Sequence, residues 1–338
     1  MPRALTIAVL ALAACDAKRE MPATRPPVAV VPAPAAPKLP GTLWFVDDST
    51  RTLARIANAT RTDLAGDGAQ LFPSRWSMPD GRLVAIASRG DGGAEPEQLA
   101  LVGGDGTITR LARTAAMVRD PVVGPRGEWI AFTATADGTS ELHRLEVATG
   151  TITRLAPNPQ GNFTPTALTG DWVAFASSRD GDSEIYRTNT RGVALQRLTA
   201  FHRDDFAPAA SPDGATIAFA SDREGAVRIF LIAADGTQLR RLTTRASSDP
   251  DELDHVWSRD GKHLAYVSGD HVYVRDVAAA TERDLTPRDA RDAEPTFSPD
   301  GAWIAVARAD AIVAIELATG TAVRVTTGGA PRLPRWHP

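Results

Sequence analysis

Apolar and polar residues alternate in short blocks that recur along most of the chain. Each block holds four stretches of strand length: one before a glycine turn, a nearly continuous apolar run, a third apolar stretch, and a more polar closing stretch. The apolar run, as in residues 129–132 or 172–175, lacks polar alternation, which is typical of a strand covered on both faces. The polar closing stretch suits an outer edge. Each block therefore predicts a four-stranded unit.

The blocks share one period. A turn glycine recurs at intervals of 40 to 47 residues, and so does the leucine or valine of the closing stretch. The glycines are Gly81, Gly127, Gly170, Gly214, Gly261 and Gly301, and the closing positions are Leu64, Leu111, Leu155, Leu198, Leu242, Leu285 and Val325. Four strands in about 43 residues is the size of one blade of a β-propeller.

Partial units remain at both ends of the six complete ones. Residues 331–338 are typical of a first strand cut off at its turn proline, and residues 41–46 enter a unit at its turn glycine. Residues 52–57 and 61–64 supply two further strands. We expect these pieces to form one blade that closes the ring. The predicted fold is therefore all-β, a seven-bladed propeller over residues 41–338.

The amino terminus departs from this pattern. Residues 4–14 are uncharged and mostly apolar, and they are too few to span a bilayer. The run ends in Leu-Ala-Ala-Cys at residues 12–15, which resembles a bacterial lipobox, and Cys15 is the only cysteine of the chain. We expect a lipoprotein signal peptide over residues 1–14 and a lipid on Cys15. An ordinary secretory signal that leaves a free thiol is the alternative.

Residues 15–40 are predicted to be the lipidated cysteine and a tether. Seven prolines alternate there mainly with alanine and valine, a composition that favours extended geometry and cannot form a packed core. The expected location is the bacterial cell envelope, with the protein anchored by lipid and facing the periplasm, on either the inner or the outer membrane. The net charge of −4 and the absence of a basic stripe argue against nucleic acid as a partner.

The repeat itself points to a family. Its best-formed features are an aromatic-Ser-Pro-Asp-Gly turn, as at residues 297–301, then Ile-Ala-aromatic, then a closing Arg-Leu-Thr, as at residues 241–243. This pattern resembles the PD40 family, the WD40-like repeats of the TolB propeller. The resemblance implies the fold and leaves the function open. The TolB protein of that family looks like a soluble periplasmic protein with an α/β domain before a six-bladed propeller. Here a proline-rich tether stands in place of that domain and seven blades are predicted, so the amino-terminal partner contacts of TolB are not carried over.

The segments leading into the innermost strands carry the candidate site. In a propeller these segments meet at one mouth of the central channel, and here three adjacent units contribute carboxylates and two histidines. Such a cluster would attract a basic peptide segment or a cation; solvated loop charges paired with local arginines are the alternative interpretation. The predicted rim consists of Asp120, His202, Asp204, Asp205, Asp251, Glu252, Asp254, His255, Asp292 and Glu294.

Three functions remain open at this point. We expect a non-enzymatic, monomeric propeller that binds an envelope protein or peptide at the channel mouth and needs no cofactor, since no catalytic motif is present. The alternative is a metal-dependent polysaccharide lyase or hydrolase, in which His202 and His255 with nearby carboxylates would hold a divalent cation. The third is an accessory subunit of an enzyme on another chain.

Overall fold

The computed structural model describes residues 39–64, 69–88, 97–113, 117–327 and 329–338. The chain divides into two units at residues 36 and 37, and all described residues belong to the second unit. They form 28 strands and no α-helix. Nowhere in these ranges is there a helix long and apolar enough to cross a membrane. The predicted signal peptide, Cys15 and nearly all of the predicted tether lie outside the described residues.

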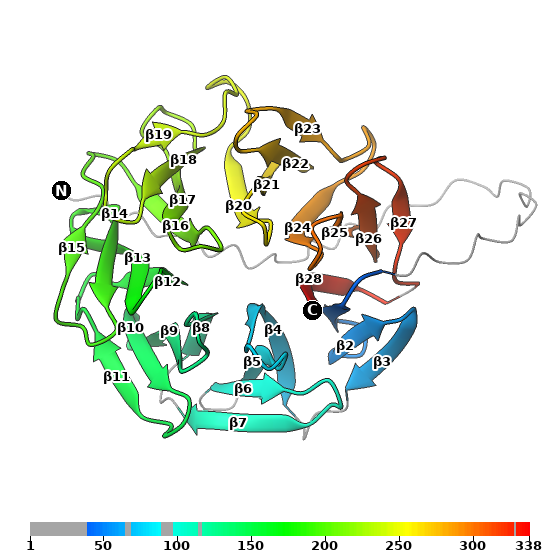
Figure 1. Cartoon of the computed structure of the whole chain (residues 1–338), viewed down its shortest axis with the longest axis horizontal. Helices are drawn as coiled ribbons and strands as arrows, with labels where there is room; N and C mark the ends of the chain where they lie inside the picture. Colours follow the sequence, from blue (N-terminus) through cyan, green and yellow to red (C-terminus); the bar gives the residue numbers. More distant parts are fainter. Residues whose placement is uncertain (1–38, 65–68, 89–96, 114–116, 328) are drawn as a thin grey trace, which may run out of the picture. The chain divides into compact units, whose positions relative to one another are not determined.

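The 28 strands form seven antiparallel four-stranded sheets that are arranged as blades around a ring (Figure 1). From the innermost strand outward, the first three blades are β28 (Pro331–His337), β1 (Thr42–Asp47), β2 (Thr52–Ala57) and β3 (Thr60–Leu64); β4 (Gln70–Ser77), β5 (Leu83–Ser88), β6 (Gln98–Val102) and β7 (Ile108–Arg113); and β8 (Met117–Val123), β9 (Trp129–Ala136), β10 (Thr139–Glu146) and β11 (Ile152–Leu155).

The other four blades follow the same order. They are β12 (Asn162–Ala167), β13 (Trp172–Asp180), β14 (Asp182–Asn189) and β15 (Gln196–Arg197); β16 (Asp205–Ala210), β17 (Thr216–Ser221), β18 (Arg228–Ala233) and β19 (Arg240–Arg241); β20 (Glu252–Trp257), β21 (His263–Ser268), β22 (His271–Asp276) and β23 (Glu282–Asp284); and β24 (Asp292–Phe297), β25 (Trp303–Arg308), β26 (Ala311–Glu316) and β27 (Ala322–Arg324). The predicted seven-bladed, all-β fold is confirmed.

The ring is closed as the repeat predicted. The last strand, β28, pairs antiparallel with the first strand, β1, and forms the innermost strand of that blade. Trp336 of β28 packs with Phe45 of β1 and with Ile312 of the neighbouring blade, so the two ends of the described chain share one core cluster. Closure in this form leaves no first or last blade with an open face.

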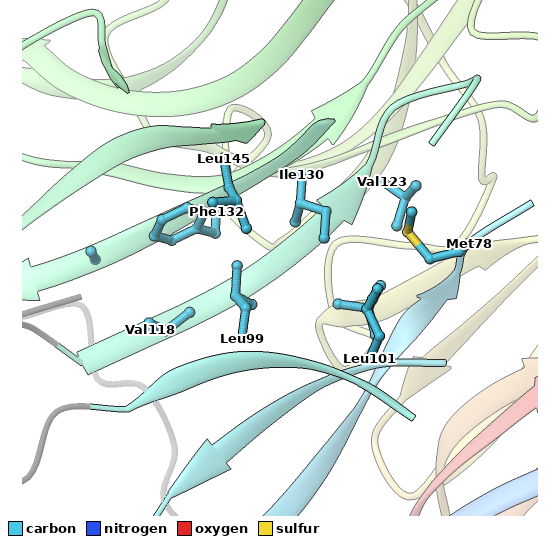
Figure 2. Close-up of a cluster of buried hydrophobic side chains, with 10 residues drawn as sticks. Met78, Leu99, Leu101, Val118, Val123, Ile130, Phe132 and Leu145 are labelled. Atoms are coloured by element: carbon cyan, nitrogen blue, oxygen red, sulfur yellow. The ribbon is translucent and has the colours of Figure 1, made fainter. Parts of the chain in front are cut away.

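The hydrophobic core lies between adjacent blades rather than inside one sheet. In the cluster shown in Figure 2, Leu99 and Leu101 of β6 meet Ile130 and Phe132 of β9, and all four are buried. The continuous apolar second strands supply most of these contacts, because both of their faces are covered. Full burial of each such side chain contributes roughly 1.5–3 kcal/mol. Each blade is therefore stabilised chiefly by its two neighbours.

The Ser-Pro-Asp-Gly motif is a hydrogen-bonded turn between the first and second strands. Ser298 donates its hydroxyl to Asp300 at 2.6 Å and accepts the backbone N–H of Trp303 at 2.9 Å. The following glycine adopts the left-handed conformation, as Gly214 does with a φ of 65°. A Cβ on Gly214 would lie 2.4 Å from the backbone nitrogen of Thr169 in the preceding blade. The motif therefore sets the turn and allows neighbouring blades to approach closely.

The innermost strands share a β-bulge, which the sequence analysis did not predict. Six of the seven place a non-glycine residue in the left-handed region at this point, with φ between 46° and 54°. These residues are Asp120, Thr164, Ala207, Asp254, Glu294 and Leu333. Five of them precede a proline, which has no N–H to donate to a strand ladder, and Asp254 precedes His255. The bulge is thus a repeated element of the fold.

Candidate functional site

The structure separates the predicted rim into acids that hold the blades together and acids at the ring centre. We call the part enclosed by the seven innermost strands the ring centre (Figure 1). Asp205, Glu252 and Asp292 begin the innermost strands β16, β20 and β24, and their side chains are buried. Buried carboxylates require charged or hydrogen-bonding partners, and all three have them.

Two of these acids form doubly hydrogen-bonded ion pairs, through one nitrogen of Arg223 for Asp205 and through two nitrogens of Arg308 for Asp292. Asp205 accepts two hydrogen bonds from Arg223, at 2.9 and 2.7 Å, and Asp292 accepts two from Arg308, at 2.5 and 2.6 Å. In each case the arginine follows or ends the second strand of the same blade, so the pair links the first and second strands. These contacts correspond to the local arginine pairing that the sequence analysis left open as an alternative.

The closing Arg-Leu-Thr motif explains the environment of Glu252. Thr243, at the end of that motif in the preceding blade, donates its hydroxyl to Glu252 at 2.5 Å. The backbone N–H of Ile229 donates to the same carboxylate at 3.0 Å. Burial raises the pKa of Glu252, and these two hydrogen bonds act in the opposite direction. Glu252 therefore ties the outer end of one blade to the innermost strand of the next.

The same threonine recurs in the next blade. Thr286 donates to Asp292 at 2.8 Å and accepts the backbone N–H of Val272 at 2.9 Å. The threonine hydroxyl thus accepts a backbone N–H of the third strand at the point where the short fourth strand no longer pairs with it. This repeated contact gives a structural role to a motif that was visible in the sequence only as a pattern.

Three further rim residues lie in the loops around these anchors. Asp204 accepts the backbone N–H of Ser183 at 2.8 Å, and Asp251 accepts that of Val227 at 2.9 Å. Each carboxylate therefore fastens the hairpin of one blade to the segment entering the next. His202 is exposed, and its ring stacks on Phe201 with 4.4 Å between the ring centroids.

Asp120, Asp254 and Glu294 take no part in these networks. They occupy equivalent bulge positions in β8, β20 and β24, the innermost strands of three blades. Glu294 accepts the backbone N–H of Leu333 at 2.6 Å. Asp120 is an exposed residue, yet the surrounding protein raises the pKa of its carboxyl by desolvation. The ring centre therefore carries three acidic side chains that are accessible to a ligand.

Two arginines that the sequence analysis did not single out also lie there. Arg75 of β4 forms an ion pair with Asp254 of β20, and both side chains are about one-third exposed. Arg335 of β28 is buried, and it interacts electrostatically with Arg75, Glu294 and Asp254. Burial lowers the pKa of Arg335 to about 10. The sequence signal available for Arg75 and Arg335 was the presence of an arginine within the first, innermost strand of a blade.

His255 does not extend the site toward a metal. It is buried, its Nε2 lies 3.4 Å from the carbonyl oxygen of Ala218, and burial lowers its pKa to about 4. His202, by contrast, is exposed. Within the described ranges, no group of three or more histidine, cysteine, aspartate or glutamate side chains is arranged to hold a metal ion.

Comparisons with known proteins agree with this architecture. The PD40 family, described as the TolB beta propeller domain, matches residues 163–272. The chain is similar to the crystal structure of TolB from Acinetobacter baumannii, at 19% identity and a TM-score of 0.59, covering 84% of this chain and 78% of that one. No curated protein matches significantly.

Two enzymes share the fold. An oligogalacturonate lyase in complex with manganese is 18% identical, with a TM-score of 0.64 over 86% of this chain and 85% of its own. A puromycin-hydrolyzing peptidase of Mycobacterium tuberculosis is 14% identical, with a TM-score of 0.64 over 85% of this chain and 53% of its own. At these identities the likeness concerns the fold alone. The repeats, the ring and the match over residues 163–272 together show that the chain forms a β-propeller with TolB-like PD40 repeats.

Proposed function

We propose that this protein is a non-enzymatic lipoprotein of the bacterial cell envelope whose propeller binds a protein or peptide. One observation carries the binding function. Asp120, Asp254 and Glu294 stand at equivalent positions at the ring centre, outside the buried networks that hold the blades together. Glu294 also accepts one backbone N–H from the next blade, but carboxylates that stay partly exposed and gather at one place are suited to recognition.

The charge of this group favours a basic partner. Three carboxylates from three blades outnumber the guanidinium groups of Arg75 and Arg335 where the innermost strands converge, and the chain as a whole is also acidic. Such a field speeds the approach of a positively charged segment and weakens as salt is added. The proposed ligand is therefore a basic segment of an envelope protein, bound at the ring centre.

Capture from membranes tests this function. The protein is crosslinked in intact cells and purified, and the captured proteins are compared with those of a variant carrying Asp120→Asn, Asp254→Asn and Glu294→Gln. We expect a defined envelope protein with the wild type and its loss with the variant. A matched control neutralises three exposed acids elsewhere, Asp63, Asp171 and Asp310. Equal capture by all three forms would contradict the proposal.

The envelope location rests on the lipobox-like residues at positions 12–15. Attached acyl chains would give the membrane affinity that stable anchoring needs, and the proline-rich segment would hold the propeller away from the bilayer. Metabolic labelling with a radioactive fatty acid tests this. Cys15→Ser should abolish the label and move the protein from the membrane fraction to the soluble one. A variant that stays membrane-bound would overturn the lipoprotein assignment.

The metal-dependent alternative has its own direct test. The described residues bring no ligand set together around His202 and His255. Elemental analysis of the purified protein decides the matter, since a stoichiometric divalent metal would favour the lyase or hydrolase function over the one proposed.

A further inference from the structure

The innermost strand β4 differs from the other innermost strands. From Gln70, its first residue, to the turn glycine Gly81 there are two more residues than from Glu252 to Gly261 in the blade of β20. The surplus enlarges the bulge, because the pairing of β4 with β5 shifts between Pro73 and Ser77. An insertion confined to one of seven repeats indicates a local feature that the fold alone does not require.

Arg75 lies in this enlarged bulge. Its guanidinium forms an ion pair with Asp254 of β20. The strands β4 and β20 stand on opposite sides of the ring, with two blades between them along the shorter path (Figure 1). The ion pair therefore bridges the ring centre rather than a seam between neighbouring blades.

Arg75 also interacts electrostatically with Asp120 of β8. Asp120 forms no ion pair with a described residue, and Arg119 is its other electrostatic partner, so the guanidinium of Arg75 pairs with Asp254 and also attracts a second carboxylate of the ring centre. In this position the guanidinium of Arg75 supplies the positive charge that a basic ligand would supply. The protein thus carries its own occupant of the acidic site.

Two buried side chains at the same place have polar atoms without a partner. His255 is 7% exposed, and its Nδ1 has no hydrogen-bond partner. Arg335 is 8% exposed, and its Nε has none. Both side chains interact electrostatically with Arg75 and Asp254. Buried polar atoms are nearly always paired in folded proteins. A neutral His255 ring could accept a hydrogen bond from a guanidinium, whereas the Nε of Arg335 is itself a donor, as at several other buried arginines of the described chain.

We propose that the ring centre is a guanidinium-binding site, that Arg75 occupies it in the free protein, and that a basic segment of the partner displaces Arg75 when it binds. The identity of the partner rests on the proposed function, whereas the site itself does not. A guanidinium is preferred to an ammonium because its planar fork can donate to two carboxylates at once.

Chemical rescue tests the site without any partner. Arg75→Ala removes the internal occupant, and the melting temperature is followed as guanidinium chloride is added at concentrations far below those that unfold proteins. Sodium chloride at equal ionic strength and urea are the controls. We expect guanidinium to raise the melting temperature of Arg75→Ala above that in either control. A ligand at about five times its Kd favours the folded state about sixfold.

Two further variants make the result specific. The wild type should show a smaller rescue than Arg75→Ala, because Arg75 occupies its site most of the time, and Arg75→Ala combined with Asp254→Asn should show none, because the acceptor is lost. If Arg75→Ala does not fold, Arg75→Gln serves the same purpose with a side chain closer in size. Guanidinium that acts no differently from sodium chloride on the single variant would overturn the inference.

Competition with a ligand gives a second measurement. A short peptide with one arginine is titrated into the wild type and Arg75→Ala by calorimetry. Because an exposed ion pair of this kind keeps the site closed only part of the time, removal of Arg75 should tighten apparent binding about fivefold. Arg82→Ala, an exposed arginine in the same blade, should bind as the wild type does. Equal affinity for the wild type and Arg75→Ala would contradict displacement.

The outcomes separate this inference from the proposed function. Rescue by guanidinium with no partner captured from membranes would support the site and overturn the proposed function. Capture of a partner in equal amounts by the wild type and Arg75→Ala, with no rescue, would overturn the site alone.

Discussion

Replacement of Trp336 tests the claim that the last strand closes the ring. The side chain is 4% exposed and packs against Phe45 and Ile312, from two different blades. Its backbone N–H donates to Thr296 at 3.2 Å, and its indole N–H donates to the carbonyl oxygen of Pro40. Trp336→Ala therefore removes contacts that join the beginning of the described chain to its end.

The expected loss of stability follows from the buried area. A buried tryptophan removes about 200 Å² from water, which at about 25 cal/mol per Å² corresponds to about 5 kcal/mol. Measured truncations of buried aromatic residues fall at about 3–5 kcal/mol. A natural domain is stable by only about 5–15 kcal/mol, so Trp336→Ala should remove a large fraction of the total.

Urea unfolding followed by circular dichroism measures this loss. With an m-value of about 3 kcal/mol per M, the midpoint should fall by at least about 1 M at unchanged slope. Trp76→Ala is the control, because Trp76 is 36% exposed and its replacement should shift the midpoint far less. Deletion of residues 331–338 should be at least as damaging as Trp336→Ala. Unfolding of Trp336→Ala at the midpoint of Trp76→Ala would refute the closure argument.

Three other predictions concern buried charges. Asp292→Asn should destabilise the protein by about 3–5 kcal/mol in urea unfolding, because it leaves the guanidinium of Arg308 without its bidentate partner; a loss below about 1 kcal/mol would show that the pair is not structural. Burial lowers the pKa of His255 to about 4. As the pH falls, the imidazole is therefore protonated in the unfolded chain at a higher pH than in the folded protein. Stability should therefore fall between about pH 6.5 and 4, and His255→Asn should remove about 2–3 kcal/mol of that dependence; an unchanged pH profile would contradict this. Although burial acts in the opposite direction, hydrogen bonds from Ser49 and Arg61 lower the pKa of Asp47 to about 2. Its contribution of about 1–2 kcal/mol should be present above about pH 4 and lost toward pH 2, and the acid limb of the unfolding curve should flatten in Asp47→Asn.

Much of the fold could be predicted because its signals are local and repeated. Nearly continuous apolar runs and turn glycines recur with a period of about 43 residues, so the unit at Gly170, where Leu-Thr-Gly replaces the Pro-Asp-Gly triplet, did not obscure the count. The closing strand was predictable because residues 331–338 and 41–46 each lack what the other supplies. The left-handed bulges were not predicted, since Asp120, Ala207 and Leu333 share no side-chain chemistry that would mark them.

The candidate site was predictable only as a region. Three neighbouring units have acids at matching positions, which indicated one end of the ring. Spacing could not tell a buried anchor from an accessible side chain, because Glu252 and Asp254 are only two residues apart. The structure separates them: Glu252 is fully buried between two blades, and Asp254 lies at the bulge with one-third of its side chain exposed.

The sequence by itself determined the number of blades and the order of their strands, because each depends on turns and apolar runs within about 45 residues. It also determined how the ring closes, because the incomplete units at residues 331–338 and 41–46 complement each other. Only the tertiary structure decided which charges meet at the ring centre. Arg75 and Asp254 are 179 residues apart in the chain, and they meet only because seven blades of similar width bend the chain through a full circle. The contact between Arg75 and Asp254 depends on the closure of the ring and on the length of one bulge. The residues that neighbour Arg75 and Asp254 in the sequence determine neither of these.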